Sequence, residues 1–330
     1  MSSAIGARDL FRLVRKGIDV TAVHANVRKP FRFLLCGDPA LIAGFRALLL
    51  SGHDDGSVPI DAAACLETIA PGTPLVTSPA EVRVVVFLGR PGDLAGAHMT
   101  PLAALPVPVL AVTVDPQSTP SGPSTLPAPR EVGEYVVPEI SKDALRSRVF
   151  PHIIEASKGV EIAVGRRLPP LRETVAAKLT RDAANNSLKV ALASAVVDHI
   201  PIVGIVLGAF ASAGDMVAIT GIQMMLLLHV EATYGKDPDV QRMWQLLPII
   251  GGGFGWRTLA RELVGFVPVA GVAIKGAIAY AGTIVVGEGV TFYLEHGRHM
   301  SKGQASQLYD RTKEDAMRFA REIIAKFRSA

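Results

Sequence analysis

The sequence predicts two domains of different class. The first is an α/β amino-terminal domain with three layers around a mostly parallel sheet, and the second is an all-α carboxyl-terminal domain of duplicated helical hairpins. In the first half, continuous apolar runs alternate with helical segments, which is typical of a parallel sheet covered on both faces. In the second half, long apolar stretches are nearly free of charge, and one pattern of proline and small residues occurs twice. The expected division is 1–30 as a basic leader helix, 31–160 as the α/β domain, 166–300 as the duplicated helical domain and 301–330 as an amphipathic helix.

Four apolar segments of the first half predict strands, because they are short, rich in β-branched residues and bounded by turn residues. They are Phe31–Cys36, Val82–Leu88, Val107–Val114 and the weaker Gly133–Val137. Asp38 followed by Pro39 predicts an N-cap and the first position of a helix that continues through Leu41–Leu50. Further helices are expected at Leu94–Leu105 and from Ser141 to about Ala156, with a loop over Pro116–Pro129.

Apolar periodicity predicts four long helices and a tail helix in the second half. They are expected at Leu171–His199, about Gly208–Tyr234, Val240–Gly265, Val272–His296 and residues 304–327. The repeated pattern predicts a helix, a proline break and a second helix that packs closely through small residues. Its copies are Pro201-Ile-Val-Gly204 with Gly208, Ala209, Ala213-Gly214, Val217 and Gly221, and Pro268-Val-Ala-Gly271 with Gly276, Ala277, Ala281-Gly282, Val285 and Gly289.

The charge-poor stretches are long enough to cross a membrane. Between Lys189 and Glu231 the only charged residues are aspartates, and Leu263–Gly287 carries a single lysine. Glycines and that lysine offset much of the apolar gain, so we expect these helices to insert, if at all, as paired hairpins. The isolated charges are expected at helix ends or in pairs across the hairpins, and the alternative is an ion path through a bundle; they are Asp198, Asp215, Lys275 and Glu288.

Composition limits the classes of function. The 330 residues are 49% hydrophobic and only 19% charged, and 34 basic residues against 30 acidic ones give a net charge of +4. So small an excess, with 6% aromatic residues, indicates no nucleic-acid binder but suits a protein beside an anionic membrane face. Cys36 and Cys65 are expected to be reduced core residues of a cytoplasmic body. His296 and His299 have an i, i+3 spacing but no third ligand nearby, so we expect surface histidines and no metal site.

The strand before Gly37 and the helix after it suggest a phosphate-binding loop, whose pattern is G-x-x-x-x-G-K-[ST]. Counting from Gly37, the second glycine is replaced by Ile42, the lysine by Ala43 and the hydroxyl residue by Gly44. Asp38 would place a carboxylate over the helix N-terminus, where it caps the free amides and repels phosphate. The sequence therefore predicts the layout of a phosphate site without its chemistry.

The later GTPase motifs are also missing. Where a GTPase carries Asp-x-x-Gly this chain reads Phe87-Leu-Gly-Arg90, and where it carries Asn-Lys-x-Asp this chain reads Val112-Thr-Val-Asp115. Only Asp115 matches. The amino-terminal domain thus resembles a degenerate small GTPase, a pseudo-GTPase. If a nucleotide binds, the candidate cofactor-binding residues are Gly37, Asp38 and Asp115.

The helical half resembles the YcjF-like family, a bacterial helical domain often joined to or encoded near GTPases. The resemblance covers about residues 168–297 and is carried by Leu168-Pro-Pro-Leu-Arg172, Ala184-Asn-Asn186, His199-Ile-Pro-Ile202, Gln223–Gly235, Arg261-Glu-Leu-Val264 with Val267-Pro268, and Ala281-Gly-Thr283 through Gly287 to Tyr293. The resemblance implies membrane association, and it does not imply any enzymatic activity. Members fused to a GTPase keep the nucleotide motifs that this chain lacks.

The sequence as a whole predicts a non-enzymatic, membrane-associated protein of a GTPase-linked system, with no catalytic residue and no cofactor. It would lie on the cytoplasmic face of the cell membrane or enter it through a helical hairpin. A GTPase or a second copy of the chain is the expected partner. The alternatives are a soluble nucleotide-binding protein or GTPase with a buried helical core, and then a small helical channel.

Overall fold

The structure is a computed structural model, and it describes residues 19–54, 56–70, 80–93, 106–197, 204–239 and 270–328. These residues divide into two compact units. The α/β unit comprises 24–175 with 233–235, and the helical unit comprises the other described residues. Residues 1–18 of the predicted leader segment, the helices Leu94–Leu105 and Val240–Gly265, and the breaks at Pro201 and Pro268 lie outside the described residues.

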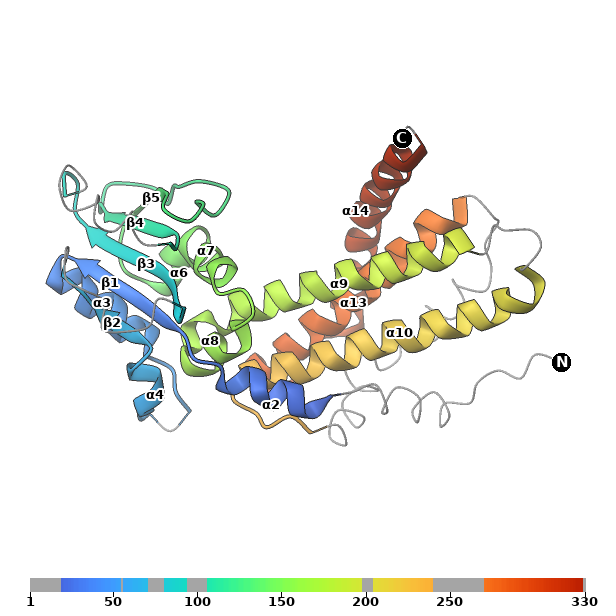
Figure 1. Ribbon diagram of the computed structural model, residues 1–330, viewed down its shortest axis with the longest axis horizontal. Coiled ribbons are helices and arrows are strands. Elements are labelled where there is room, and N and C mark those ends of the chain that lie inside the picture. Colours follow the sequence, from blue (N-terminus) through green and yellow to red (C-terminus); the bar gives the residue numbers. More distant parts are fainter. Residues whose placement is uncertain are drawn as a thin grey trace. The chain divides into compact units, whose positions relative to one another are not determined.

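A five-stranded sheet with the order β2-β1-β3-β4-β5 forms the centre of the α/β unit, and all four strand pairs are parallel (Figure 1). The strands are β1 (Arg32–Gly37), β2 (Leu66–Thr68), β3 (Val82–Gly89), β4 (Val109–Val114) and β5 (Val132–Val137). Consecutive residues of β1, β3 and β4 are buried, so these strands are covered on both faces. The predicted α/β class and parallel sheet are therefore confirmed.

Helices precede, connect and follow these strands along the chain. They are α2 (Val20–Arg28), α3 (Pro39–Leu49), α4 (Ile60–Ala63), α6 (Lys142–Arg146), α7 (Val149–Ala156), α8 (Glu161–Arg167) and the 3₁₀ turn η1 (Pro169–Leu171). Helix α3 packs on β1 and β3, and α7 packs on β3. The single helix predicted from Ser141 to Ala156 is wrong, because the chain breaks between α6 and α7. Pro151 explains the break. In a continuous helix its ring would clash with the carbonyl group of residue 147, and it has no N–H to donate to that carbonyl.

Strand β2 was not predicted, because three residues with two polar side chains carry no recognisable periodicity. Strand β2 is held in place by hydrogen bonds to neighbouring segments. Its neighbour β1 pairs with it, and Phe33 N donates to Cys65 O at 2.8 Å. On α3, the Arg46 guanidinium donates to Leu66 O and, at 3.0 Å, to Ala63 O. Arg46 thereby satisfies carbonyls next to the sheet edge, where unpaired groups would invite another strand.

Arg167 fastens the end of α8 to the beginning of the α/β unit. Its side chain is only 14% exposed. The guanidinium donates to Lys29 O at 3.0 Å, contacts Asp61 Oδ2 at 2.9 Å and lies 5.4 Å from the centre of the Phe31 ring. One planar cation thus joins segments more than 100 residues apart, as arginine can because its donors point in several fixed directions.

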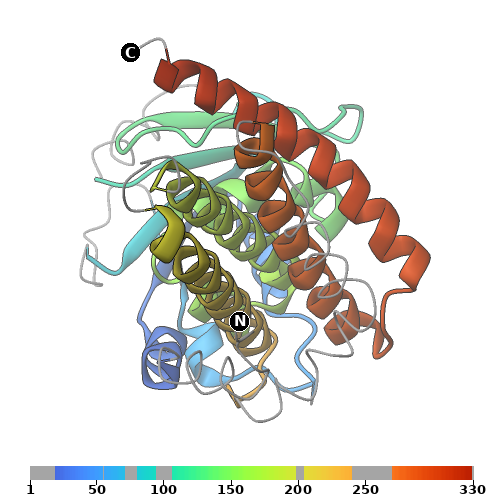
Figure 2. The same ribbon diagram turned by 90° about the vertical axis from the view of Figure 1, so that its right-hand side faces the viewer.

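Four long helices make up most of the described part of the helical unit, in agreement with the all-α prediction. They are α9 (Arg172–Val197), α10 (Gly204–Thr233), α13 (Ala270–His296) and α14 (Lys302–Arg328). Helices α9, α10 and α13 lie side by side, and α14 crosses α13 (Figure 2). The described part of each repeat copy lies within one helix, α10 or α13.

Small and polar residues make the contacts between α9 and α13. A Cβ atom at Gly287 would collide with the Thr180 side chain, and one at Gly276 would lie 2.6 Å from Leu188 Cδ1. Between these glycines, the Thr283 and Ser187 hydroxyls are hydrogen-bonded at 3.0 Å, and Gln223 Nε2 of α10 donates to Thr283 Oγ1 at 3.2 Å. All three polar side chains are buried, so this junction connects three helices at one level.

The close α9–α13 contact predicts that Gly287→Ala will lower the free energy of unfolding by about 1–3 kcal/mol, because the added methyl group overpacks against Thr180. Gly221→Ala on α10 is the matched control, since nothing lies within 4 Å of a Cβ atom there. It should raise the free energy of unfolding by up to about 1 kcal/mol through its helix propensity. Urea unfolding of the full chain, followed by circular dichroism, measures both; equal effects of the two variants would contradict the proposed packing.

Candidate functional site

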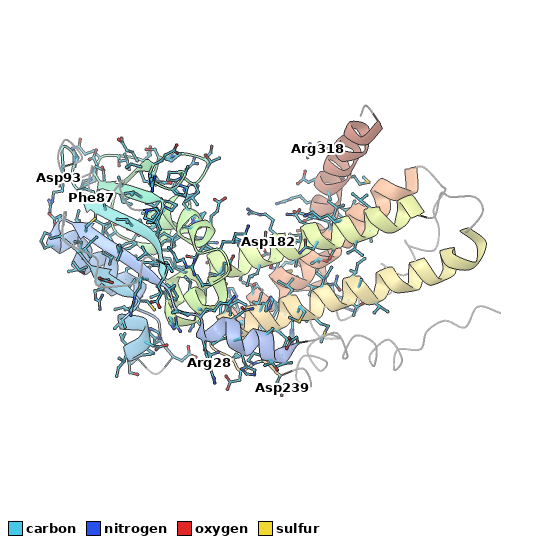
Figure 3. The ribbon with its side chains drawn as sticks, in the orientation of Figure 1. Arg28, Phe87, Asp93, Asp182, Asp239 and Arg318 are labelled. Atoms are coloured by element: carbon cyan, nitrogen blue, oxygen red, sulfur yellow. The ribbon has the colours of Figure 1, made fainter. Side chains whose placement is uncertain are left out.

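The carboxyl edge of the sheet is the first place to look for a site. With the order β2-β1-β3-β4-β5, the direction of chain progression reverses between β1 and β3, and ligands of open α/β sheets bind outside the strand ends at such a point. Gly37 ends β1 and Asp38 follows it, Arg90 and Asp93 follow β3, and Asp115 follows β4. Phe87 and Asp93 mark this end of β3 in Figure 3.

The connection from β1 to α3 consists of one residue, Asp38. Its Oδ1 accepts hydrogen bonds from Ala40 N at 2.8 Å and Leu41 N at 3.1 Å, and Pro39 occupies the first turn of the helix. The predicted N-cap is therefore confirmed. A phosphate-binding loop wraps several residues around its ligand and offers those same amides to it. In this chain the amides are taken by a carboxylate of the protein itself.

Gly37 is required by the backbone. Its φ is +113°, and a Cβ atom there would collide with Leu88 O and lie 2.9 Å from Leu88 C. The adjacent Asp38 N donates to Leu88 O at 2.8 Å. A residue with a side chain would be strained in conformation and would also strike β3. The backbone therefore requires glycine at position 37 whether or not a phosphate binds.

Arg90 and Asp93 complete the edge beside Asp38. Arg90 Nε lies 3.5 Å from Asp38 Oδ2, and Arg90 N donates to Asp93 Oδ2 at 2.7 Å. The pKa of Asp38 is lowered. The Leu41 amide is the largest influence and lowers it, desolvation opposes this, and the Ala40 amide and Arg90 lower it further. The carboxylate therefore stays ionised, and negative charge is held where a phosphate would have to bind.

Asp115 lies at the same edge, but β3 separates its strand from β1, so it is two strand spacings, about 10 Å, from Asp38. Its Oδ1 accepts from Gln117 N at 3.0 Å, and its carbonyl oxygen accepts from Ser118 N at 3.0 Å and Ser118 Oγ at 2.7 Å. The side chain thus closes a local turn. The structure brings Gly37, Asp38 and Asp115 to one edge, with both carboxylates bound to nearby backbone amides.

Sequence reasoning missed the parts played by Arg90 and Asp93. It treated the segment ending at Arg90 only as a failed GTPase motif. Gly89 and the Pro-Gly-Asp sequence at 91–93 were an available signal for a sharp turn after β3. The pairing of Arg90 with Asp38 was not, because 52 positions separate them in the chain.

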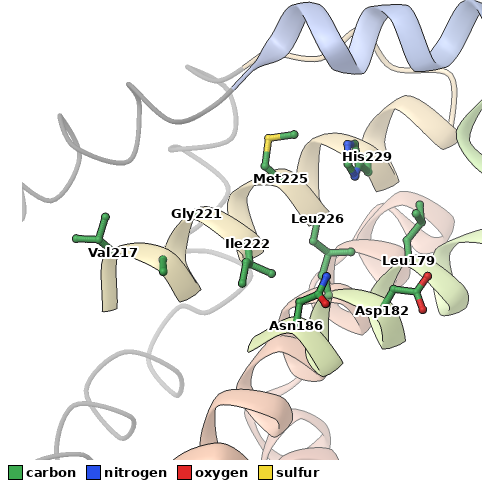
Figure 4. Close-up of a pocket in the computed structure, with 11 residues that line it drawn as sticks. Leu179, Asp182, Asn186, Val217, Gly221, Ile222, Met225, Leu226 and His229 are labelled. Atoms are coloured by element: carbon green, nitrogen blue, oxygen red, sulfur yellow. The ribbon is translucent and has the colours of Figure 1, made fainter. Parts of the chain in front are cut away.

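A groove of about 490 Å³ in the helical unit is the second candidate (Figure 4). Helix α10 supplies an apolar wall that includes Val217, Ile222 and Met225. Helix α9 supplies Asp182 and Asn186, and the Asp182 carboxylate is paired with Lys178 Nζ at 2.6 Å. The groove is therefore suited to contact with an apolar group. The carboxylate of Asp182 in its lining already has a partner in Lys178.

The remaining predicted residues add no reactive group to either region. Cys36 and Cys65 are both buried free thiols, and burial raises the pKa of Cys36 to about 12. No group of three histidine, cysteine or acidic residues within the described ranges is placed to hold a metal ion. Of the isolated charges predicted in the apolar helices, Asp198 lies outside the described residues, the side chains of Asp215 and Lys275 are likewise not described, and Glu288 is half-buried on α13.

Comparison with known proteins adds no assignment. No family model, curated protein or solved structure matches this chain.

The Asp38 cap predicts a pH-dependent contribution to stability. Because the folded pKa is lowered, the unfolded chain takes up the proton first as the pH falls. Asp38 should therefore stabilise the fold above its unfolded pKa of about 3.9 and lose this effect as the pH falls through the lower folded value. Thermal unfolding of the wild type and Asp38→Ala should differ at neutral pH and converge in acid. Asp38→Ser keeps an acceptor but no charge, so its difference from Asp38→Ala should not change with pH.

Proposed function

We propose that this chain is a non-enzymatic, membrane-associated protein of a GTPase-linked system. Its α/β unit serves as a pseudo-GTPase interaction module, and its helices, as duplicated hairpins, dock on or in the cytoplasmic membrane. A GTPase or a second copy of the chain is its partner. The resemblance of the helical half to the YcjF-like family supports the same assignment.

The observation that carries the proposal is the one-residue connection between β1 and α3. Asp38 fills the hydrogen-bonding positions of the helix N-terminus and puts a negative charge there. A nucleoside triphosphate would need to displace this carboxylate and then bind without a phosphate-loop lysine. An α/β domain with a parallel sheet but no phosphate-binding loop can still offer a surface to a partner protein. It is not equipped to hydrolyse a nucleotide.

The membrane part of the proposal is supported by α13. Within the described residues, Gly276–His296 is the one helix segment long and apolar enough to cross a bilayer, and Val217–Thr233 of α10 is a shorter apolar segment. Buried core helices of soluble proteins meet the same criteria, and 61% of the apolar window of α13 is buried. The glycine contacts and the Thr283 junction favour the membrane, because helices in lipid pack through small residues and hydrogen-bonded polar ones.

Membrane association can be tested by fractionating cells that express the full chain. We expect the protein in the membrane pellet. Carbonate extraction then separates the two modes, since an inserted hairpin stays in the pellet and a surface-docked protein is released. A protein found wholly in the soluble fraction, monomeric without detergent, would refute membrane docking.

A soluble nucleotide-binding protein is the second candidate, favoured by the strand order and by the position of Asp115 at the carboxyl edge. Titration with fluorescent GTP and ATP analogues separates it from the first. Our proposal predicts no saturable, Mg²⁺-dependent binding, and no difference between the wild type and Asp115→Ala. Saturable binding that Asp115→Ala abolishes would establish the second candidate instead.

A further inference from the structure

The chain folds back on itself where α13 ends. Gly297 follows His296 with φ +66°, a left-handed conformation that ends helices, and Gly297 N donates to Tyr293 O at 2.9 Å. The turn returns the next residues towards the last turn of α13, before α14 begins at Lys302. Five aromatic and basic side chains meet here, and we call them the helix-end cluster: Phe292, Tyr293, His296, Arg298 and His299.

Two stacks organise the helix-end cluster. In one, the His296 ring lies 4.2 Å from the Phe292 ring at 18°, and the Arg298 guanidinium lies 5.0 Å from the centre of that same ring. In the other, His299 lies 4.9 Å from Tyr293 and nearly parallel to it, at 4°. The aromatic rings are half-buried, whereas His296, Arg298 and His299 are exposed. The cluster therefore has an aromatic base and a polar, basic surface.

Its charge is predominantly positive. From Gly297 through Tyr309 the chain carries Arg298 and Lys302 and no acidic residue, while Glu295 precedes the turn. All three are exposed. Stacking on Phe292 covers one face of the Arg298 guanidinium and leaves its N–H groups at the rim available to an anion.

We propose that the helix-end cluster is the contact through which the helical unit binds the headgroups of an anionic membrane. This inference rests on the membrane docking proposed above and names the lipid class and the residues. The cluster ends the one described segment with the length and composition of a membrane span. Aromatic rings and basic side chains at the end of an apolar helix are the composition that anchors helices at a bilayer surface. A basic side chain near an anionic surface contributes binding energy that a neutral surface does not supply.

Vesicle flotation of the full-length protein tests the contact, using phosphatidylcholine vesicles and vesicles that also contain phosphatidylglycerol. The wild type should bind the anionic vesicles more strongly. Arg298→Gln should lower its partition coefficient on those vesicles about fivefold, the equivalent of about 1 kcal/mol, with little change on neutral ones. Phe292→Leu should lower binding to both, because the contribution of the ring does not depend on lipid charge.

Arg148→Gln is the matched control, because it removes the same charge from an exposed position of the α/β unit. It should bind like the wild type. If the wild type floats with vesicles and Arg298→Gln and Phe292→Leu float equally well, the helix-end cluster is not the contact, although membrane docking stands. If the wild type floats with neither vesicle, membrane docking itself is refuted and this inference with it.

A fluorescent label gives a second measurement that does not alter the helix-end cluster. Gly303 on α14 is exposed, and nothing lies within 4 Å of a Cβ atom there. Because Cys36 and Cys65 are only 0% and 3% exposed, an environment-sensitive thiol dye should react chiefly at Gly303→Cys. Its emission should shift to the blue with anionic vesicles, and a dye at Arg148→Cys should not respond. Equal responses at both positions would contradict the assigned contact.

Discussion

The passage of the backbone from β1 into α3 is the constraint on which the carboxyl edge of the α/β unit depends. Gly37 lies so close to Leu88 that no side chain fits, and this contact sets how β1 and β3 approach each other. The very next residue must then begin the helix, and Asp38 does so with its own carboxylate. Arg90, at the end of β3, follows from the same geometry, because it is brought within reach of that carboxylate. The close approach of β1 to β3 and the occupied amides at the start of α3 thus belong to one arrangement of the backbone.

The helical unit likewise depends on close packing of its backbone segments. Where α9 and α13 approach, glycine faces a threonine side chain, and hydroxyl and amide groups replace large apolar residues. Buried polar groups are costly unless they bond to one another, so the Ser187–Thr283–Gln223 junction fixes how far along their axes the three helices can slide. Small residues and hydrogen-bonded polar groups are also the contacts through which helices pack in lipid, the surroundings proposed for this unit.

Helix α13 combines the two properties that the proposed function needs. Its middle is small and apolar and packs against α9, and it also carries α14 through Ala281, Val285, Ala305 and Tyr309. Its end is aromatic and basic, folded into two stacks by a left-handed glycine. One helix therefore has a packed interior segment and a terminus of a different chemistry. In a protein that docks on a membrane, this division separates the part that holds the bundle together from the part that meets the headgroups.

The sequence by itself determined the class of each half, four of the five described strands, the Asp38 cap and the four long helices that the structure describes, because caps and apolar periodicity act between residues a few positions apart. Pro151 was an equally local signal for the break between α6 and α7, and it was overlooked. Strand β2 was beyond such reasoning, since three residues take up that conformation only through β1 and Arg46. Only the tertiary structure decided the strand order, the Arg90–Asp38 pair, the Thr283 junction and the stacking of Arg298 and His299 on α13. Each of these contacts joins groups that the folded backbone brings together, and the sequence contains no local signal for which distant groups will be neighbours.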